Sequence, residues 1–385
     1  MRVLMALDYY RPHASGLSIT VERLAHGLAD RGHAVTILTH RYTRNLPEEE
    51  REGPAFVRVI RADVLGRVGK AQISPGLIWR ARREMAATDV VHLHAPLAPA
   101  VPLAYLAKAR GLPLVVNYHC DLKLPAGPVN RALETIARAS QNYAVDRADV
   151  LINSTEDYAR ATPPLARHLD RFVPIVPPVP DPNDPVATRE QLRARWKIPS
   201  GPVILFVGRF AEEKGIHHLI AALPIVRAAL PDAVLLLAGE RTEIPGETVG
   251  ERLAPLLADP TSGVVATGFV PDEEMSSLFA LADVLVLPST NSTESFGQIQ
   301  VEAMLSGLPV VASDLPGVRE PIRRTGMGKI APIGDPRGLA GQIVEVLRSP
   351  DRYKQSRSRV RKLFLLDQTI SLYEAAYGRA RTPVK

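Results

Sequence analysis

Short runs of apolar, often β-branched residues alternate with helix-like stretches along this chain, and a proline-rich segment interrupts the alternation once. Before the interruption, such runs predict strands at 2–7, 34–39, 56–60, 90–93, 114–118 and 150–153. These runs are apolar throughout instead of alternating with polar residues, which is typical of parallel strands that are buried on both faces. Helices that connect parallel strands give a doubly wound α/β domain.

The interruption is the segment 173–185, VPIVPPVPDPNDP, which holds six prolines in thirteen positions, too many for a helix or a central strand. After it the alternation restarts, with predicted strands at 203–207, 233–237, 263–266, 283–287 and 309–312. We therefore predict an N-terminal domain over 1–182 and a C-terminal domain over 183–365, with 366–385 crossing back to the first. Because open α/β sheets bind ligands at the carboxyl ends of their strands, we expect the site in a cleft between the domains.

The composition predicts a cytoplasmic protein. The single cysteine, Cys120, excludes an internal disulfide and a cysteine-based zinc site. No apolar run reaches the roughly 18 residues that span a bilayer, and the first residues lack the pattern of a signal peptide.

Positive charge is concentrated in the N-terminal half: 1–182 holds 23 basic and 18 acidic residues, and 183–385 holds 24 and 23. One interpretation is a solvated surface, and another is a patch that binds an anionic lipid or a phosphorylated acceptor. Nucleic acid is disfavoured, because no aromatic residues interleave these charges. Within 58–84 seven residues are basic, namely Arg58, Arg61, Arg67, Lys70, Arg80, Arg82 and Arg83.

The same segment contains apolar residues beside the arginines, among them Ile73, Leu77, Ile78 and Trp79. On the lipid interpretation these side chains enter the interface of the inner membrane face, and the protein binds there peripherally. On the competing interpretation Trp79 and its apolar neighbours form the buried face of a helix.

The most informative segment follows the predicted strand at 283–287 and reads ESFGQIQVEAM from Glu294. Ser295 and Gln298 have the spacing of a capping box, so we expect Ser295 to cap a helix whose first residues are Phe296 and Gly297. Their N–H groups would then be available to a ligand oxygen. Glu294 and Glu302 could face one ligand at two heights, although two exposed glutamates on a helix remain the alternative.

A second segment, GRFAEEKG, follows the predicted strand at 203–207. Gly208 makes the turn, and Arg209 and Lys214 supply two cations ahead of a helix. Such a turn can hold a diphosphate, although it lacks the order of a P-loop. The alternative is a surface turn with solvated charges.

Two weaker signals lie in the N-terminal half. Gly16 lies between the first predicted strand and a predicted helix at 19–31, in a turn without a dinucleotide-binding fingerprint, so simple turn geometry is the favoured explanation. His92, His94 and His119 lie at the ends of predicted strands, where functional side chains collect, although buried histidines are often structural. The sequence contains no spacing typical of a dedicated metal site, so we expect none.

Taken together, these motifs resemble family 4 of the retaining glycosyltransferases, which have the GT-B fold, and the resemblance extends over essentially the whole chain. The pair Glu294 and Glu302 within ESFGQIQVEAM, and GRFAEEKG about 80 residues upstream, are the specific motifs. The stretches DVVHLH and NYHCD match the N-terminal pattern of the family less specifically. The sequence departs from that pattern at Ser15-Gly16, where many members have two glycines, and in the proline-rich segment.

The resemblance implies a role for each matching residue. Arg209 and Lys214 hold the donor diphosphate, and Gly16 offers its amide to the same group. Glu294, with the amides of Phe296 and Gly297, holds hydroxyls of the donor sugar. The resemblance further implies that Glu302 binds the nucleotide ribose and that His119 contacts the donor sugar near the acceptor.

The expected activity is metal-independent transfer of a hexosyl group from UDP- or GDP-hexose to a hydroxyl of a sugar or lipid-linked acceptor, with an α-linkage and no cofactor. Two alternatives stay open. One is a sugar-nucleotide epimerase or hydrolase on the same fold, and the other is an inactive GT-B scaffold that binds a sugar nucleotide or a partner.

Overall fold

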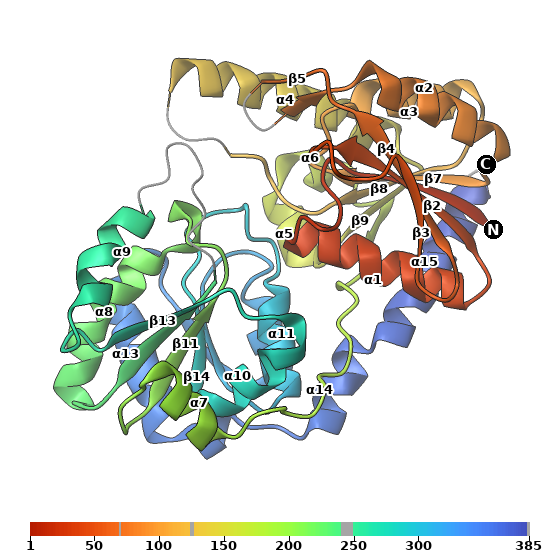
Figure 1. The fold of residues 1–385 in the computed structure, drawn as a ribbon. Coiled ribbons are helices and arrows are strands. Elements are labelled where there is room, and N and C mark those ends of the chain that lie inside the picture. The colour runs from red at the N-terminus through yellow and green to blue at the C-terminus, as the bar shows by residue number, and fades with distance from the viewer. Residues whose placement is uncertain (69–70, 124–126, 240–248, 383–385) are drawn as a thin grey trace. The chain divides into compact units, whose positions relative to one another are not determined.

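A computed structural model describes residues 1–68, 71–123, 127–239 and 249–382 of the chain (Figure 1). The chain divides into two compact units. Unit 1 comprises Met1–Pro178 and the segment that begins at Leu365, and unit 2 comprises Val179–Phe364. The division thus falls slightly before residue 182, inside the proline-rich segment.

Unit 1 is built on an eight-stranded sheet with the order β10-β9-β8-β7-β1-β2-β4-β3. Its strands are β1 (Arg2–Ala6), β2 (Ala34–Arg41), β3 (Glu49–Glu52), β4 (Val57–Asp63), β7 (Val90–Ala95), β8 (Leu114–Tyr118), β9 (Val150–Asn153) and β10 (Phe172–Pro174). All neighbours pair in parallel except β3 and β4. Strands β5 (Gly66–Val68) and β6 (Ala71–Ile73) form a separate antiparallel pair.

Helices cover both faces of this sheet, as the continuously apolar strands require (Figure 1). They are α1 (Gly16–Asp30), α2 (Pro75–Glu84), α3 (Ala100–Ala109), α4 (Pro128–Arg147), α5 (Glu156–Ala161), α6 (Pro163–Ala166) and α15 (Leu366–Arg381). One apolar cluster joins the sheet to α2, α3 and α4, and another joins it to α1 and α15. The C-terminal helix α15 therefore belongs to the core of unit 1.

Unit 2 is built on a six-stranded parallel sheet with the order β13-β12-β11-β14-β15-β16. Its strands are β11 (Val203–Val207), β12 (Val234–Ala238), β13 (Val264–Gly268), β14 (Val284–Leu287), β15 (Val310–Ser313) and β16 (Gly328–Ala331). The chain runs outward from β11 to β13 and then returns to the other side of β11 at β14. The order of the strands therefore reverses between β11 and β14.

The helices of unit 2 are α7 (Arg189–Trp196), α8 (Ile216–Ala229), α9 (Val249–Ala258), α10 (Met275–Leu281), α11 (Gln298–Leu305), α12 (Glu320–Thr325), α13 (Pro336–Arg348) and α14 (Arg357–Phe364). Helices α8 to α12 connect the strands of this unit, α7 precedes β11, and α13 and α14 follow β16. Its apolar core includes side chains from β11, α8 and α13. Two parallel-sheet, Rossmann-like units confirm the predicted α/β class.

Three strands of the two large sheets were not predicted from the sequence: β3, β10 and β16. Strand β3 reads EERE and pairs on one side only, at the end of the sheet, so charged side chains can point away from the core. Strand β10 contains Pro174 and is also an edge strand, which is where a proline is tolerated. Strand β16 begins at Gly328 and contains Lys329, so it lacks the apolar run that marks the other strands.

Candidate functional site

The carboxyl ends of β11 and β14 lie side by side where the strand order of unit 2 reverses. Open α/β sheets bind their ligands at such a switch point. The two most informative sequence motifs lie after these two strands: GRFAEEKG follows β11 directly, and ESFGQIQVEAM spans the end of the connection after β14 and most of α11. The fold therefore brings together two motifs that are about 80 residues apart in the sequence.

The connection after β11 is a compact turn. Gly208 leaves the strand with its N–H group bonded to the carbonyl of Ala238 at the end of β12, 2.9 Å away. Residues Glu212–Lys214 form one turn of 3₁₀-helix, and Gly215 is the N-cap of α8, in the left-handed conformation with φ 68°. A side chain at Gly215 would place its Cβ 2.0 Å from the carbonyl oxygen of Pro288, so only glycine fits there.

Backbone contacts tie this turn to the connection after β14. The N–H group of Thr290 donates to the carbonyl of Glu213 over 2.9 Å, and the Thr290 hydroxyl donates to the same oxygen over 3.2 Å. Together with the close approach of Gly215 to Pro288, these bonds fix the two loops against each other. Side chains carried by the two loops consequently have defined relative positions.

Lys214 and Glu294 form an ion pair across these loops. The Lys214 ammonium donates to a carboxylate oxygen of Glu294 over 2.6 Å. The two side chains are 25% and 16% exposed, so the pair is neither fully solvated nor fully enclosed. A cation and an anion that remain in contact with solvent can each bind a ligand group of opposite charge or a hydroxyl.

Arg209, the other predicted cation, lies in the same turn. Its guanidinium donates to the carboxylate of Glu213 over 3.2 Å, and its side chain is 38% exposed. This interaction with Glu213 was not predicted. It holds the guanidinium within the turn, and a guanidinium has further N–H groups that can donate to two phosphate oxygens.

The predicted capping box at Ser295 is wrong. Helix α11 begins at Gln298, and its N-cap is Gly297, which has φ 75° and makes no side-chain cap. A Cβ at Gly297 would lie 2.4 Å from a methyl carbon of Leu287 and 2.8 Å from the Gln300 amide nitrogen. The close packing of this turn on β14 therefore requires the glycine, and the chain reaches the helix two residues later than the capping pattern predicts.

The backbone at this turn nevertheless presents the predicted N–H groups. In the part of the chain that the structure describes, no hydrogen bond uses the N–H group of Phe296 or of Gly297. The Phe296 side chain is buried and packs edge-on against Phe364, with ring centroids 6.2 Å apart. The buried Gln300 amide donates to the carbonyls of Phe296 and Val318 and so holds the turn in place.

Glu302 lies on α11, and its side chain is half-buried. The structure thus places Glu302 on the helix that starts at the Gly297 turn, as the eight-residue spacing from Glu294 predicts. The predicted residues of unit 2 thus lie on the connections that follow β11 and β14, except Glu302, which lies on α11; those on the connections are Gly208, Arg209, Lys214, Glu294, Phe296 and Gly297.

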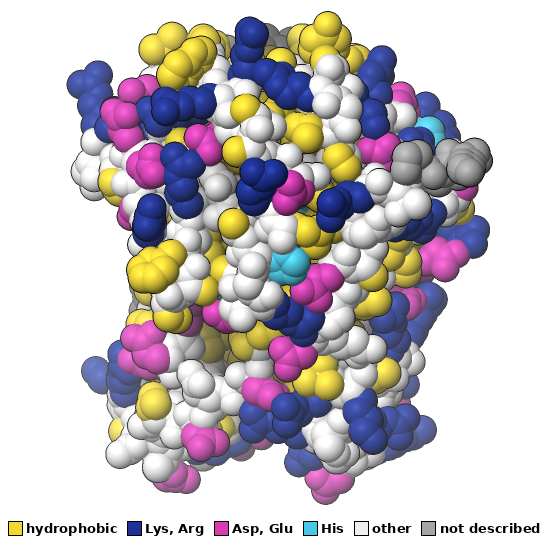
Figure 2. All heavy atoms as spheres, turned by 90° about the vertical axis from the view of Figure 1, so that its right-hand side faces the viewer, with side chains coloured by type: hydrophobic (Ala, Val, Ile, Leu, Met, Phe, Trp, Pro, Cys, Tyr) yellow, Lys and Arg dark blue, Asp and Glu magenta, His cyan; other side chains and the backbone are white. Residues whose placement is uncertain are grey.

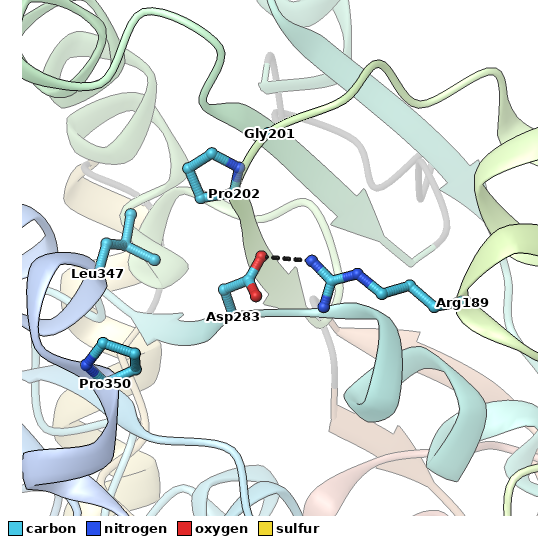
Figure 3. A pocket seen from close by; sticks show the side chains of 6 residues that line it. All are labelled: Arg189, Gly201, Pro202, Asp283, Leu347 and Pro350. Carbon is cyan, nitrogen blue, oxygen red and sulfur yellow. Dashed lines mark hydrogen bonds and ion pairs between the residues drawn. The ribbon is translucent and has the colours of Figure 1, made fainter.

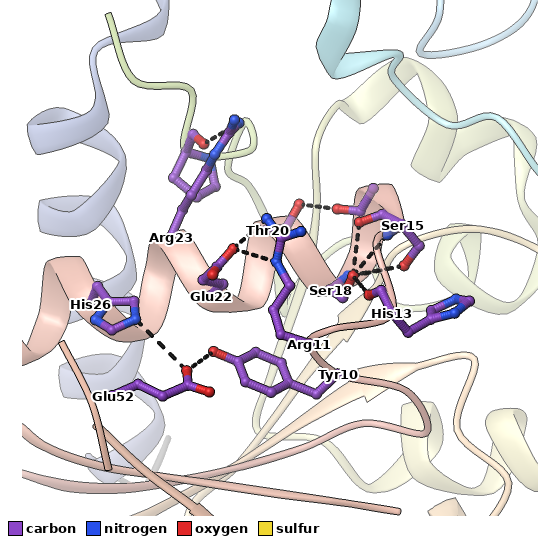
Figure 4. A network of polar contacts seen from close by, with 12 residues as sticks. Tyr10, Arg11, His13, Ser15, Ser18, Thr20, Glu22, Arg23, His26 and Glu52 are labelled. Carbon is purple, nitrogen blue, oxygen red and sulfur yellow. Dashed lines mark hydrogen bonds and ion pairs between the residues drawn. The ribbon is translucent and has the colours of Figure 1, made fainter. Parts of the chain in front are cut away.

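In unit 1, Gly16 is the first residue of α1, and Ser15 is the N-cap of that helix. The Ser15 and Ser18 side chains cap each other's backbone N–H groups, at 3.2 and 2.9 Å (Figure 4). The helix thus begins three residues earlier than predicted. Figure 4 also shows that Arg11 reaches Glu22 and that Tyr10 donates to Glu52, which fixes the loop between β1 and α1.

The three histidines that were singled out from the sequence, all in unit 1, lie together. His92 and His94 are completely buried on β7, and His119, directly after β8, is half-buried. A ring nitrogen of His94 (Nδ1) lies 2.9 Å from Nε2 of His119. Burial lowers the pKa of His92 and of His119 to about 3 and keeps that of His94 well below its usual range. All three rings are therefore neutral near pH 7.

Asp8 was not singled out from the sequence. It follows β1, and its carboxylate accepts the N–H group of Ala98, after β7, at distances of 3.0 and 3.2 Å. Burial raises the pKa of Asp8 to about 7, and the hydrogen bond from Ala98 acts in the opposite direction. Its position directly after the predicted apolar strand at 2–7 is the signal that could have identified it.

A pocket of about 220 Å³ lies elsewhere in unit 2, lined by Arg189, Gly201, Pro202, Asp283, Leu347 and Pro350 (Figure 3). Pro202 and Asp283 precede β11 and β14, so this pocket lies at the amino ends of the strands. The ion pair between Arg189 and Asp283 occupies part of its wall, and Asp283 also accepts the N–H group of Val203. Its polar groups are thus used within the fold.

Metal-binding clusters and membrane spans are absent from the described residues. Among them, no group of three or more histidine, cysteine, aspartate or glutamate side chains is placed to hold a metal ion. None of the helices that the structure describes is both long enough and apolar enough to cross a bilayer.

Comparisons with known proteins show the family. Residues 201–349 match a family model described as glycosyl transferases group 1, and residues 15–177 match one described as a glycosyl transferase 4-like domain. The chain is 30% identical to the phosphatidyl-myo-inositol mannosyltransferase of Mycobacterium leprae over 91% of this chain and 88% of that protein. It is 29% identical to the 2-deoxystreptamine glucosyltransferase of Streptomyces kanamyceticus over 87% and 90% of the two chains.

Among solved structures, Anabaena HepE in complex with UDP-glucose has a similar fold, with a TM-score of 0.74, 20% sequence identity and coverage of 97% of this chain and 99% of that chain. The fold and the site thus define a glycosyltransferase with the GT-B fold. The chain belongs to family 4 of the glycosyltransferases and transfers a sugar.

Proposed function

We propose that this protein transfers a hexosyl group from UDP- or GDP-hexose to a hydroxyl of a sugar-like acceptor, with retention of the anomeric configuration. The observation that carries the proposal is the ion pair between Lys214 and Glu294 beside the Gly297 turn. The ion pair supplies a cation for a phosphate and a carboxylate for sugar hydroxyls, and the turn beside it supplies two N–H groups. The complex of HepE with UDP-glucose supports a nucleotide sugar as the donor.

Each loop contributes one part of the donor site in this proposal. Lys214 and Arg209 bind the diphosphate and stabilise the negative charge that develops on it as the glycosidic bond breaks. Glu294 and the N–H groups of Phe296 and Gly297 bind sugar hydroxyls, and Glu302 binds the ribose. Gly16 and His119 of unit 1 contact the diphosphate and the sugar, as the family resemblance implies.

The proposed reaction has one proton transfer. The acceptor hydroxyl attacks the anomeric carbon on the face that the leaving diphosphate vacates, and the departing phosphate oxygen takes the hydroxyl proton. Nuclear magnetic resonance of the first product formed distinguishes the two stereochemical outcomes, because the coupling constant of its anomeric proton reports the configuration. A product with inverted configuration overturns the proposed mechanism.

For the acceptor we propose a cyclitol or a sugar, free or linked to a lipid. The names of two relatives specify six-membered carbocycles with several hydroxyl groups, myo-inositol and 2-deoxystreptamine. A panel that contains inositol, inositol phosphate, phosphatidylinositol, an aminocyclitol and simple hexoses tests this. Transfer to a hexose but to no cyclitol excludes the cyclitol, and donor turnover without transfer to any member favours a hydrolase.

Thermal denaturation with nucleoside diphosphates tests the donor site itself. The preferred diphosphate should raise the melting temperature of the wild-type protein, since a ligand that binds the folded state stabilises it. Lys214→Ala should abolish the increase, whereas Lys329→Ala should keep it. Lys329 is a matched control because it forms a similar ion pair with Glu345, over 2.9 Å, outside the two loops. An unchanged response in Lys214→Ala contradicts the site, and no response of the wild-type protein to any diphosphate favours an inactive scaffold.

We also propose that transfer needs no metal ion, because Lys214 and Arg209 supply the charge that a cation supplies in other transferases. Activity should persist after exhaustive treatment with a chelator. Loss of activity that Mg²⁺ or Mn²⁺ restores contradicts this.

A second proposal concerns the surface of unit 1: we propose peripheral contact with an anionic membrane. The interpretation that buries Trp79 is wrong, because this side chain on α2 is 63% exposed, and Ile73 is 49% exposed. Leu77, by contrast, is fully buried. Arg82 and Arg83, on the last turn of α2, are exposed beside Trp79.

The charge of this surface is smaller than the sequence suggests. Arg61 is buried and pairs with Glu50, Arg58 bonds Glu49 and Glu84, and Arg80 bonds Glu48, while Lys70 lies outside the described residues. On the face drawn in Figure 2, basic side chains are interspersed with acidic and apolar ones. The proposed contact is therefore reversible and weak.

A further inference from the structure

Three imidazole rings form a row within unit 1. His92 and His94 are two residues apart on β7, so they project from the same face of the sheet, and His119 follows the neighbouring strand β8. The ring centroids of His92 and His94 are 4.0 Å apart, and those of His94 and His119 are 5.2 Å apart. The N–H group of His119 also donates to the carbonyl of Ala95 over 2.8 Å, which fixes its backbone.

Helix α15 closes the inner end of this row. Its Tyr377 hydroxyl lies 2.9 Å from Nδ1 of His92, and its Tyr373 hydroxyl accepts the amide N–H of Asn117 over 2.8 Å. Both tyrosines and His92 are buried. The position of His92, and through ring contact that of His94, is therefore determined by packing.

The hydrogen bond between His94 and His119 has two possible directions, because each neutral imidazole carries one N–H group and one lone pair. Burial lowers the pKa of both histidines far enough to keep the rings neutral in neutral solution. Either Nδ1–H of His94 donates to Nε2 of His119, or Nε2–H of His119 donates to Nδ1 of His94. The direction decides which nitrogen of His119 carries its proton.

The surroundings of His94 favour the first direction. Nε2 of His94 is buried and has no hydrogen-bond partner in the described part of the chain. If His94 accepted at Nδ1, its own proton would sit on that buried Nε2 as an unpaired donor, and orphaned buried N–H groups are the rarer defect in proteins. Nδ1 of His119, in contrast, is not among the buried nitrogens that lack a partner.

We propose that His94 is a positioning residue: it donates to Nε2 of His119 and thereby fixes His119 as the tautomer with its proton on Nδ1. His119 then presents a neutral hydrogen-bond donor. That this donor meets an oxygen of the transferred sugar rests on the proposed function, whereas the tautomer itself does not.

Nuclear magnetic resonance of the full chain with ¹⁵N-labelled histidine rings tests the tautomer without substrate. The His119 signals are assigned from their loss in His119→Gln. At pH 7 we expect Nδ1 protonated in the wild-type protein and in His94→Asn, whose amide nitrogen can take the place of Nδ1. Leucine has no hydrogen-bond donor, so in His94→Leu we expect His119 no longer to hold a single tautomer. A wild-type His119 with its proton on Nε2, or an unchanged His119 spectrum in His94→Leu, overturns the proposal.

Kinetics separate this proposal from the proposed function. In His94→Leu we expect kcat to fall about tenfold, the effect of one ordinary hydrogen bond, with an unchanged Kd for the nucleoside diphosphate. His94→Asn should restore kcat. If the spectra change as expected and kcat does not, the assignment of the tautomer stands and the contact of His119 with the sugar fails.

Discussion

The two units place candidate functional residues near the carboxyl ends of central strands, but these residues are charged in unit 2 and neutral in unit 1. In unit 2 the strand ends carry Lys214, Glu294 and Arg209, whose side chains are between 16% and 38% exposed and remain ion-paired. In unit 1 they carry His94 and His119, which burial keeps neutral. One site is charged and in contact with solvent, and the other is uncharged and largely enclosed.

In the proposed function the two groups of residues have different tasks. A diphosphate gains negative charge as it leaves, so the groups that bind it must carry permanent positive charge, and partial solvation keeps them charged. A sugar hydroxyl carries no charge. A neutral hydrogen-bond donor in a fixed orientation can bind it, and no charged group then has to be buried.

The largest effect should come from removing charge in unit 2. Lys214→Met keeps most of the side-chain volume but loses the ammonium, and we expect kcat/KM to fall by about 10- to 100-fold, as for other charge-assisted contacts. Arg209→Met should behave similarly. Steady-state kinetics check this, with Lys329→Met as the control. If both variants keep activity within a factor of two of the wild type, the result contradicts the distinction between a charged site in unit 2 and a neutral one in unit 1.

The next effect concerns how rigidly the charged loops are held. Gly297→Ala must accommodate both a positive φ and the contact with Leu287, whereas Gly307→Ala, with φ 81° and no atom near its Cβ, must accommodate only the φ. We expect Gly297→Ala to lower the free energy of unfolding by about 1–3 kcal/mol more than Gly307→Ala, as overpacking does. Urea denaturation of the two variants measures the difference, and equal losses would show that the turn can relax.

The neutral histidines of unit 1 should make the free energy of unfolding depend on pH. Burial lowers the pKa of His92 to about 3, so this histidine stays neutral in the folded protein while the unfolded chain binds a proton below about pH 6.5. The free energy of unfolding therefore falls as the pH falls from 6.5 towards 3. Asp8, whose pKa is raised to about 7, acts in the opposite direction, so a variant is needed to isolate the histidine.

We therefore expect His92→Phe to flatten the decline in the free energy of unfolding between pH 6.5 and 4.5, by up to about 1.4 kcal/mol per pH unit. Urea denaturation at several pH values measures it, and the exposed His13→Phe is the control. A slope identical to that of the wild type would mean that His92 is protonated in the folded state.

The smallest effect is expected at the surface of unit 1. Each exposed arginine near an anionic membrane adds at most about 1 kcal/mol, and several of the described arginines there are already paired with glutamates. We expect the wild-type protein to float with anionic vesicles at low salt and to be released at high salt, and Arg82→Ser with Arg83→Ser to float less. Protein that stays in the soluble fraction at low salt contradicts the contact.

Much of the fold could be predicted from the sequence because the parallel strands are buried on both faces, and burial leaves an apolar run that is visible in the sequence. β8, β9 and β11 were predicted with the bounds that the structure gives them. The strands that were missed, β3, β10 and β16, carry charged residues, a proline or a glycine, because edge positions relax the demand for apolar side chains.

The start of α11 shows the limit of local patterns. Ser295 and Gln298 satisfy the spacing of a capping box, but the turn packs on Leu287, and this contact moves the helix start to Gln298. Trp79 shows the same limit, because an apolar cluster in the sequence does not indicate which of its side chains are buried against the sheet.

The sequence by itself determined the class of fold, its division into two α/β parts and the residues that carry charge in the two loops of unit 2, since these depend on residue type and on spacing along the chain. Only the tertiary structure decided which of those residues meet. The pairing of Lys214 with Glu294, and of His94 with His119, depends on which strands are neighbours in each sheet. Strand order results from packing among segments far apart in the chain, and no local pattern records it.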